Sequence, residues 1–274
     1  MNISRGWACG RWPRRRGNKK TSNAERPTSN FEFKDHFSKQ AADYAKFRPR
    51  YPTELFRWLA SIAPANDLAW DCATGSGQAA VELVEVFLRV IATDASQKQI
   101  ANADAHPRVE YRVAPAENSG LEAKSVDLIT VAQALHWFDL EEFYAEARRV
   151  LKPQGVLAAW AYKLATVTPS VDEVVNHYYS EVVGGFWPAE RVLVEKFEEL
   201  SFPLPEIETP AFQMVADWRV EQLLGYLRTW SATQRFMMAE KRDPLESVES
   251  ELRSTWGSEL RRAVWPLTVR VGRV

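Results

Sequence analysis

The chain has 274 residues, of which 46% are hydrophobic and 26% are charged, proportions typical of a globular protein. Its formal net charge of −1 argues against nucleic acid as the main partner, because phosphate binding requires a broad basic excess. No apolar run approaches the roughly 18 residues that would cross a membrane. The two cysteines, Cys9 and Cys72, lie far apart and indicate a reducing compartment without disulfides.

Residues 1–30 differ in composition from the rest of the chain. The stretch "SRGWACGRWPRRRGNKK" is basic and interrupted by glycines and a proline, and Glu25 is the only acid before residue 30. This composition predicts a disordered basic tail on a cytoplasmic protein, with an organelle-targeting peptide and a nucleic-acid-binding arm as the alternatives. The remaining residues, 31–274, are predicted to form one domain.

Helices and strands alternate along the first half of that domain. "FKDHFSKQAADYAKFRP" and "YPTELFRWLASIAP" have helical periodicity. They are followed by the strand "DLAWDCA", the helix "GQAAVELVEVF", the strand "RVIATD", the helix "SQKQIANADA" and the strand "VEYRVA". "VDLITVAQAL" and "GVLAAWAY" are typical of buried strands and flank the amphipathic helix "LEEFYAEARRVL". This alternation predicts a doubly wound, parallel α/β sheet with right-handed crossovers.

The alternation loosens after Tyr162. Residues 163–202 and 217–258 are mostly helical and rich in aromatic residues, which predicts a helical cap around an aromatic-lined cavity. "EIETPAFQMVA", between the two cap segments, and "AVWPLTVRVGRV", at the end of the chain, indicate two further strands.

The stretch "AWDCATGSGQAA" places a glycine-rich loop between a short apolar strand and a helix. "GSGQAA" satisfies G-x-G-x-x-A, which by itself is compatible with a dinucleotide. Asp71 ends the strand four residues before Gly75, where its carboxylate would repel phosphates and attract an ammonium group. S-adenosylmethionine (SAM) carries an ammonium, a sulfonium and no phosphate. The loop therefore favours SAM over NAD(P).

A second acid ends the next strand. Asp94 lies 23 residues after Asp71, close to the spacing of about 20 at which a strand-end acid meets ribose hydroxyls. A carboxylate can accept both vicinal hydroxyl protons, and this feature is common to SAM and NAD. For both acids the alternative is a side chain that only caps backbone N–H groups.

The loop "QALHWFD" supplies candidate catalytic groups. We predict that His136 orients or deprotonates a methyl acceptor and that Trp137 walls the pocket. The alternatives for His136 are a contact with the cofactor and a structural hydrogen bond to a neighbouring carbonyl. The other histidines are isolated from cysteine and from one another, so no metal site is predicted.

Together these motifs resemble the class I SAM-dependent methyltransferases. "DCATGSGQ", "TDAS", "APAENSGLEAKSVDLITVAQALHWFD" and "EARRVLKPQGVLAAW" carry the resemblance. "YAKFRPRYP", "LLGYLRTWSATQRF" and "WPLTVRVGRV" extend it, over residues 31–274, toward the small-molecule group related to trans-aconitate methyltransferase. The resemblance implies a Rossmann-like sheet of seven strands with the last one antiparallel, and a helical cap. It also implies methyl transfer to a carboxylate or hydroxyl of a small-molecule acceptor by a monomer or homodimer.

The resemblance further implies which residues bind. The expected cofactor-binding residues are Asp71, Ala73, Gly75, Gly77, Asp94, Ala95, Ser96, Ala116, Glu117, Gln133, Tyr44 and Arg48. The expected acceptor-binding residues are His136, Trp137, Tyr226, Trp230 and Arg235. Arg48, Arg228 and Arg235 together favour an acidic acceptor.

One position departs from the family pattern. Members commonly have glycine where this chain has Ala73, and a methyl group there would crowd a ligand if the backbone needs a positive φ. A SAM-binding but inactive protein is therefore one alternative, and an NAD(P)-dependent oxidoreductase is another. A SAM-dependent methyltransferase is the leading interpretation.

Overall fold

A computed structural model describes residues 47–274. The tail predicted over residues 1–30, Tyr44 and most of the first predicted helix lie outside the described residues. The first complete helix that is described, α2 (Thr53–Ile62), starts after Pro52, whose fixed φ and missing N–H suit a helix start. Its apolar face buries Leu55, Phe56 and Leu59.

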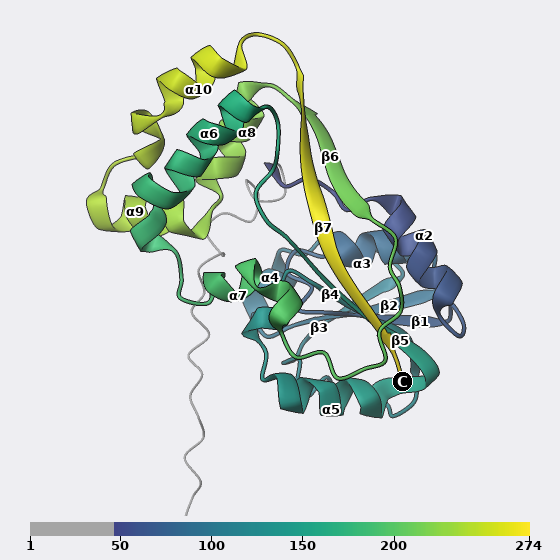
Figure 1. Ribbon diagram of the computed structural model, residues 1–274. Helices are drawn as coiled ribbons and strands as arrows, with labels where there is room; N and C mark the ends of the chain where they lie inside the picture. Colours follow the sequence, from purple (N-terminus) through teal and green to yellow (C-terminus); the bar gives the residue numbers. More distant parts are fainter. Residues whose placement is uncertain (1–46) are drawn as a thin grey trace, which may run out of the picture. The chain divides into compact units, whose positions relative to one another are not determined.

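Seven strands form one sheet in the order β3-β2-β1-β4-β5-β7-β6 (Figure 1). Their bounds are β1 (Leu68–Cys72), β2 (Arg89–Asp94), β3 (Val109–Val113), β4 (Val126–Ala132), β5 (Leu151–Tyr162), β6 (Phe212–Trp218) and β7 (Arg261–Arg273). β1 to β5 pair in parallel, and β7 runs antiparallel to both β5 and β6. The predicted doubly wound, seven-stranded sheet with an antiparallel last strand is confirmed. This last strand lies between β5 and β6, one position in from the edge.

Successive residues of the central strands point to opposite faces and build two cores. On one face, Leu128 and Trp160 pack with residues of α2 and α3 (Gln78–Leu83). On the other face, Ile129 and Leu157 pack with α5 (Leu140–Val150), which its N-cap Asp139 starts. Since parallel strands covered on both faces must be apolar throughout, these strands appear in the sequence as continuous hydrophobic runs. The short helix α4 (Gln97–Ala101) is capped by Ser96, the first residue of the predicted helix "SQKQIANADA".

The cap consists of helices inserted on either side of β6. α6 (Pro169–His177) and α7 (Arg191–Glu195) precede β6, and α8 (Val220–Arg228), α9 (Ser231–Glu240) and α10 (Glu249–Trp256) follow it. Single turns of helix occupy Leu135–Trp137 (η1), Tyr178–Val182 (η2), Gly184–Phe186 (η3), Phe197–Glu199 (η4) and Pro244–Ser247 (η5). No described helix is both long enough and apolar enough to span a bilayer.

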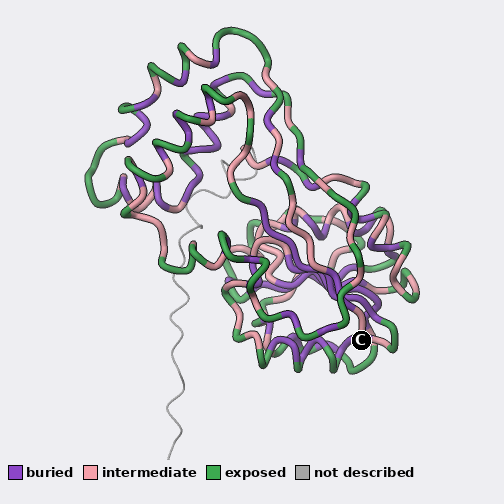
Figure 2. The backbone as a smooth tube through the Cα atoms, in the orientation of Figure 1, coloured by how far each residue is buried: buried purple, intermediate pink, exposed green. Residues whose placement is uncertain are grey.

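The β6–β7 pair connects the cap to the sheet. β5 ends at Tyr162 opposite Leu267, whereas β6 and β7 remain paired from there as far as Trp218 and Arg261. The pair therefore continues past the carboxyl end of β5 and leads into α8 and α10 (Figure 1). Buried residues of α8 to α10 are continuous with the core beneath α2 and α3, and they line the inner side of the cap (Figure 2).

Candidate active site

The loop between β1 and α3 takes a left-handed backbone conformation at three residues. The φ angles are +55° at Ala73, +58° at Gly75 and +89° at Gly77. Where a Cβ of Gly75 would stand there is open space, so a ligand can approach the backbone closely at that point. At Gly77 a Cβ would overlap the hydroxyl of Tyr111, so the packing against Tyr111 is by itself enough to require a glycine at this position.

Asp71 lies at the predicted strand end, but its side chain is only 1% exposed. The hydroxyls of Thr74 and Thr130 donate to its two carboxylate oxygens at 2.5 and 2.8 Å. Burial raises the pKa of Asp71 to about 6, against the effect of those hydrogen bonds. The carboxylate therefore acts on the loop surface through its electric field and through Thr74, which it holds in place.

Asp94 lies at the end of β2 beside the same loop. Its carboxylate oxygens accept the backbone N–H groups of Gly75 at 2.9 Å and of Ser96 at 2.8 Å. These bonds are of the backbone-capping kind considered for this acid. Each carboxylate oxygen has two lone pairs, so after accepting these two hydrogen bonds the carboxylate can still accept hydrogen bonds from ribose hydroxyls. The neighbouring Ala95 is exposed.

The segment after β3 lies against α5. Ala116 is buried, and Glu117 accepts the backbone N–H of Asp139 at 3.0 Å. Further along the same loop, Glu146 of α5 accepts the backbone N–H of Ser119 at 2.9 Å and also its hydroxyl proton. These bonds fix the loop that carries Ala116 and Glu117, two of the expected cofactor-binding residues.

This edge of the sheet fits SAM. Residues 71–78 and 92–96 contain two acids, Asp71 and Asp94, and no lysine or arginine that could neutralise a pyrophosphate. An open glycine backbone and a buried negative charge suit a cationic amino-acid group. The described residues contain no cluster of His, Cys, Asp and Glu that could hold a metal ion.

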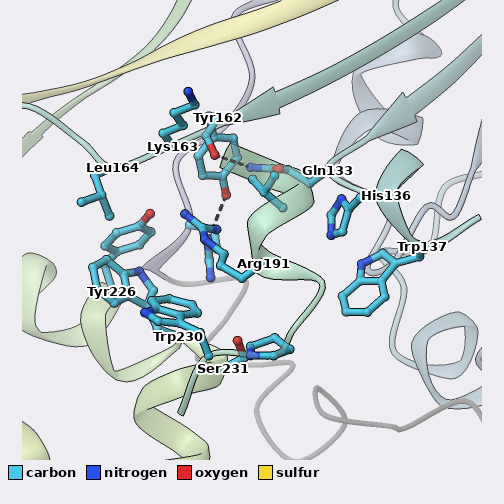
Figure 3. Close-up of a pocket in the computed structure, with 14 residues that line it drawn as sticks. Gln133, His136, Trp137, Tyr162, Lys163, Leu164, Arg191, Tyr226, Trp230 and Ser231 are labelled. Atoms are coloured by element: carbon cyan, nitrogen blue, oxygen red, sulfur yellow. Dashed lines mark hydrogen bonds between the residues drawn. The ribbon is translucent and has the colours of Figure 1, made fainter. Parts of the chain in front are cut away.

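A cavity of about 120 Å³ lies where β4 and β5 end. The described residues that line it are Arg48, Gln133, His136, Trp137, Tyr162, Lys163, Leu164, Trp187, Pro188, Arg191, Val194, Tyr226, Trp230 and Ser231. Figure 3 shows His136 and Trp137 on one side of it and Tyr226 and Trp230 on the opposite side. Gln133 has a strained φ of +56°, and its side-chain amide donates to the carbonyl of Tyr162 at 3.1 Å.

His136 is a neutral side chain in this cavity. Burial, assisted by the charge of Arg191, lowers its pKa to about 4. Its ring lies 4.8 Å from that of Trp137, which is 47% exposed. Nδ1 is buried and makes no hydrogen bond to a described residue. The hydrogen bond to a neighbouring carbonyl, considered as a structural alternative, is thus not seen at this nitrogen.

Two arginines face the cavity from the segment before α2 and from the cap. Arg48 donates to the hydroxyl of Tyr162 at 2.9 Å, and its guanidinium lies 4.9 Å above the ring of Tyr226. Arg191 lies 4.9 Å above the ring of Trp187 and forms an ion pair of 3.1 Å with Glu195. The structure thus places Arg48 among the residues that line the cavity.

Arg235 and Arg228 are not part of this site. Arg235 is half-buried on α9 and is not among the residues that line the cavity. Arg228 is 44% exposed and forms a 3.0 Å ion pair with Asp243. Arg235 was expected to bind the acceptor from the family resemblance, and Arg228 was grouped with it as favouring an acidic acceptor. The resemblance does not reveal which helix face borders the cavity. Arg191 and Lys163 supply the cavity's positive charge in their place.

The strand order 3-2-1-4-5-7-6, the glycine loop after the first strand and the acids ending the first two strands define a class I SAM-dependent methyltransferase. A model of the methyltransferase domain family matches residues 70–159. A Dictyostelium discoideum protein named as a methyltransferase is 35% identical over 81% of this chain and 86% of its own. An uncharacterized methyltransferase of Schizosaccharomyces pombe is 29% identical over 79% of this chain and 85% of its own.

A solved structure of a type II methyltransferase from Anaeromyxobacter dehalogenans is also similar. It is 47% identical, covers 82% of this chain and 97% of its own, and superposes with a TM-score of 0.78. The chain belongs to this methyltransferase family and is an enzyme of that class. The family and fold imply SAM as the methyl donor, and these matches do not favour an oxidoreductase.

Ala73 offers a test of the glycine loop. A left-handed backbone costs alanine roughly 1 kcal/mol, and glycine avoids this cost. We expect Ala73→Gly to leave the free energy of unfolding unchanged or to raise it by up to about 1 kcal/mol, and to tighten SAM binding. Ala145→Gly, at an exposed position inside α5, is the control and should lower stability by about 1 kcal/mol. Denaturant melts and SAM titrations measure both effects; weaker SAM binding by Ala73→Gly would contradict the prediction.

Proposed function

We propose that this enzyme transfers the methyl group of SAM to an oxygen of a small anionic acceptor bound in the cavity. The observation that supports the acceptor class is the charge of the wall. Arg48, Lys163 and Arg191 line the cavity, and no Asp or Glu is among the described residues that do so. Cations in a recess that is partly shielded from water attract an anion. A carboxylate is the favoured nucleophile, and a hydroxyl on an anionic molecule is the alternative.

The cofactor side of the proposal assigns residues to parts of SAM. Asp94 would hold the ribose, the loop from Ala73 to Gly75 the methionine end, and the segments around Ala95 and Glu117 the adenine. When bound, SAM supplies a methyl group on a sulfonium, which is already a good leaving group. The chain's own contribution is to hold the acceptor in line with that methyl group and to exclude water.

The acceptor's chemistry decides what His136 does. A carboxylate needs no base at neutral pH, so His136 would only orient it. A hydroxyl reacts better when its proton is removed, and the neutral imidazole of His136 can take that proton. His136 is neutral above about pH 5 because its pKa is about 4, so it is available as an acceptor across the physiological range.

We expect His136→Gln to distinguish the two acceptor classes. With a hydroxyl acceptor, kcat should fall by roughly 10²- to 10⁴-fold, and the wild-type rate should stay level from pH 8 to about 5 before it declines. With a carboxylate acceptor, the loss should be only a few-fold. His177→Gln, at an exposed residue of α6, is the control. Full activity of His136→Gln on every acceptor would contradict both roles.

The acceptor itself can be identified by incubating a pool of cell metabolites with isotope-labelled SAM and characterising the labelled product. A methyl ester or ether of an anionic metabolite would support the proposal, and a methylated cationic amine would contradict it. Parallel titrations with SAM and NAD(P) test the cofactor. Binding of NAD(P) instead of SAM would refute the proposal, and SAM binding without S-adenosylhomocysteine release for any acceptor would indicate an inactive protein.

A further inference from the structure

Tyr162 lines the cavity and was not among the predicted site residues. It is the last residue of β5, where its backbone pairs with Leu267 of β7, and it is 6% exposed. Its carbonyl accepts the side-chain amide of Gln133, so the loop after β4 holds it from the other side (Figure 3). The backbone that carries the ring is therefore held by the sheet on one side and by Gln133 on the other.

The hydroxyl of Tyr162 has one defined role, which is to accept a hydrogen bond. The donor is Nη1 of Arg48 at 2.9 Å, and no other described residue forms a hydrogen bond with this hydroxyl. Because the arginine uses a lone pair of the oxygen, the phenolic proton is directed elsewhere. Donation from a cation also polarises the O–H bond and makes it a stronger donor.

We propose that Tyr162 is a specificity-determining residue of the acceptor site, and that its polarised hydroxyl donates to a carboxylate oxygen of the acceptor. The inference rests on the proposed function, because it takes the cavity as the acceptor site. A carboxylate oxygen forms a charge-assisted bond with this hydroxyl beside Arg48, whereas the carbonyl of a neutral amide forms a weaker one. Tyr162 thereby favours the acid over a neutral molecule of the same shape.

The position of Arg48 depends on a glycine of the cap. A Cβ on Gly225 would overlap the ring of Phe47, so that ring packs directly against the backbone of α8. The next residue of α8, Tyr226, provides the ring beneath the Arg48 guanidinium. Two adjacent residues of α8, Gly225 and Tyr226, thus contact two adjacent residues of the segment before α2, Phe47 and Arg48. Gly225 is a positioning residue that acts on Tyr162 through Arg48.

Binding of simple probes tests this inference without knowledge of the natural acceptor. Acetate, succinate and benzoate, each with its amide, are titrated calorimetrically into the full chain, with and without S-adenosylhomocysteine. We expect at least one carboxylate to bind the wild type about tenfold more tightly than its amide. Tyr162→Phe should weaken that carboxylate about tenfold and its amide by less than about threefold. The matched control is Tyr144→Phe, which removes a hydroxyl bonded to the Ser201 carbonyl outside the cavity and should change neither affinity.

A second variant tests the same site without altering a cavity residue. Gly225→Ala should displace Phe47 and Arg48 and weaken carboxylate binding while S-adenosylhomocysteine binds as in the wild type. Equal losses for carboxylate and amide in Tyr162→Phe, or unchanged carboxylate affinity in it, would overturn the inference. So would a wild type that binds S-adenosylhomocysteine but none of the carboxylates. Failure of the wild type to bind S-adenosylhomocysteine would instead contradict the proposed function.

Discussion

Replacement of Asp71 by asparagine is expected to stabilise the protein at pH 7 and to weaken its binding of SAM. Asp71 is almost fully buried, the hydroxyls of Thr74 and Thr130 donate to its carboxylate, and burial raises its pKa to about 6. In the unfolded chain the pKa of aspartate is about 3.9, so between about pH 4 and 6 the folded state binds more protons. Stability therefore falls as the pH rises through this window. Above it the ionised side chain costs on the order of 2–3 kcal/mol, of which a neutral asparagine should recover up to about 2 kcal/mol.

The test compares the free energy of unfolding of wild type and Asp71→Asn from pH 4 to 8. The difference in the free energy of unfolding in favour of the variant should be greatest at pH 7 and above. It should vanish near pH 4, where the wild-type carboxyl is also neutral. SAM should bind the variant at least about tenfold more weakly at pH 7.5, because the negative field that attracts its ammonium is lost. A variant less stable than the wild type at pH 7, or one that binds SAM equally well, would refute this account.

Asp127 provides the matched control for that experiment. It is also fully buried, but it lies near the start of β4, remote from the glycine loop, and its carboxylate accepts Nζ of Lys152 at 3.0 Å. Asp127→Asn breaks this ion pair and should destabilise the protein, with SAM binding unchanged. The contrast between the two acids shows why Asp71 is unusual. The fold retains a buried negative charge beside a ligand loop, and no described lysine or arginine forms an ion pair with it, an arrangement that favours function over stability.

The central sheet could be predicted because its signals are local. β1, β2 and β4 are short apolar runs, and two of them are followed by residues, Gly77 and Ser96, that precede a helix. The place of Asp94 at a strand end could be predicted because its distance from Asp71 along the chain reflects one β-α-β unit. Burial of Asp71 could not be foreseen, since it depends on Thr130 of a strand that is distant in sequence.

The residues that line the cavity were predicted less completely. His136 and Trp137 follow β4 directly, so the strand pattern itself placed them at the ligand edge. Tyr162 had a comparable signal, because it ends a predicted strand at the same edge of the sheet. Arg191 had none: it stands in a five-residue helix of the cap, where no periodicity indicates which side faces the cavity.

Replacement of Asp94 by alanine should weaken SAM binding, as Asp71→Asn does, but it should lower the stability of the protein, whereas Asp71→Asn raises it. The carboxylate of Asp94 is 7% exposed and accepts the backbone N–H groups of Gly75 and Ser96. Asp94→Ala leaves both donors without a partner close to the ligand loop. We expect the free energy of unfolding to fall by about 1–3 kcal/mol. SAM binding should weaken by at least about 100-fold, because the proposed acceptor for the ribose hydroxyls is lost together with the loop anchor.

Thermal melts with and without SAM measure both effects for Asp94→Ala. The SAM-dependent rise in Tm should disappear, and the melt without SAM should occur at a lower temperature than in the wild type. The control is Asp172→Ala on α6, which also removes a carboxylate that accepts a backbone N–H, that of Val167 at 2.8 Å. It should lower Tm but keep the shift that SAM produces. If Asp94→Ala kept a wild-type SAM shift, Asp94 would be only a loop cap, and the ribose would have to be bound by other residues.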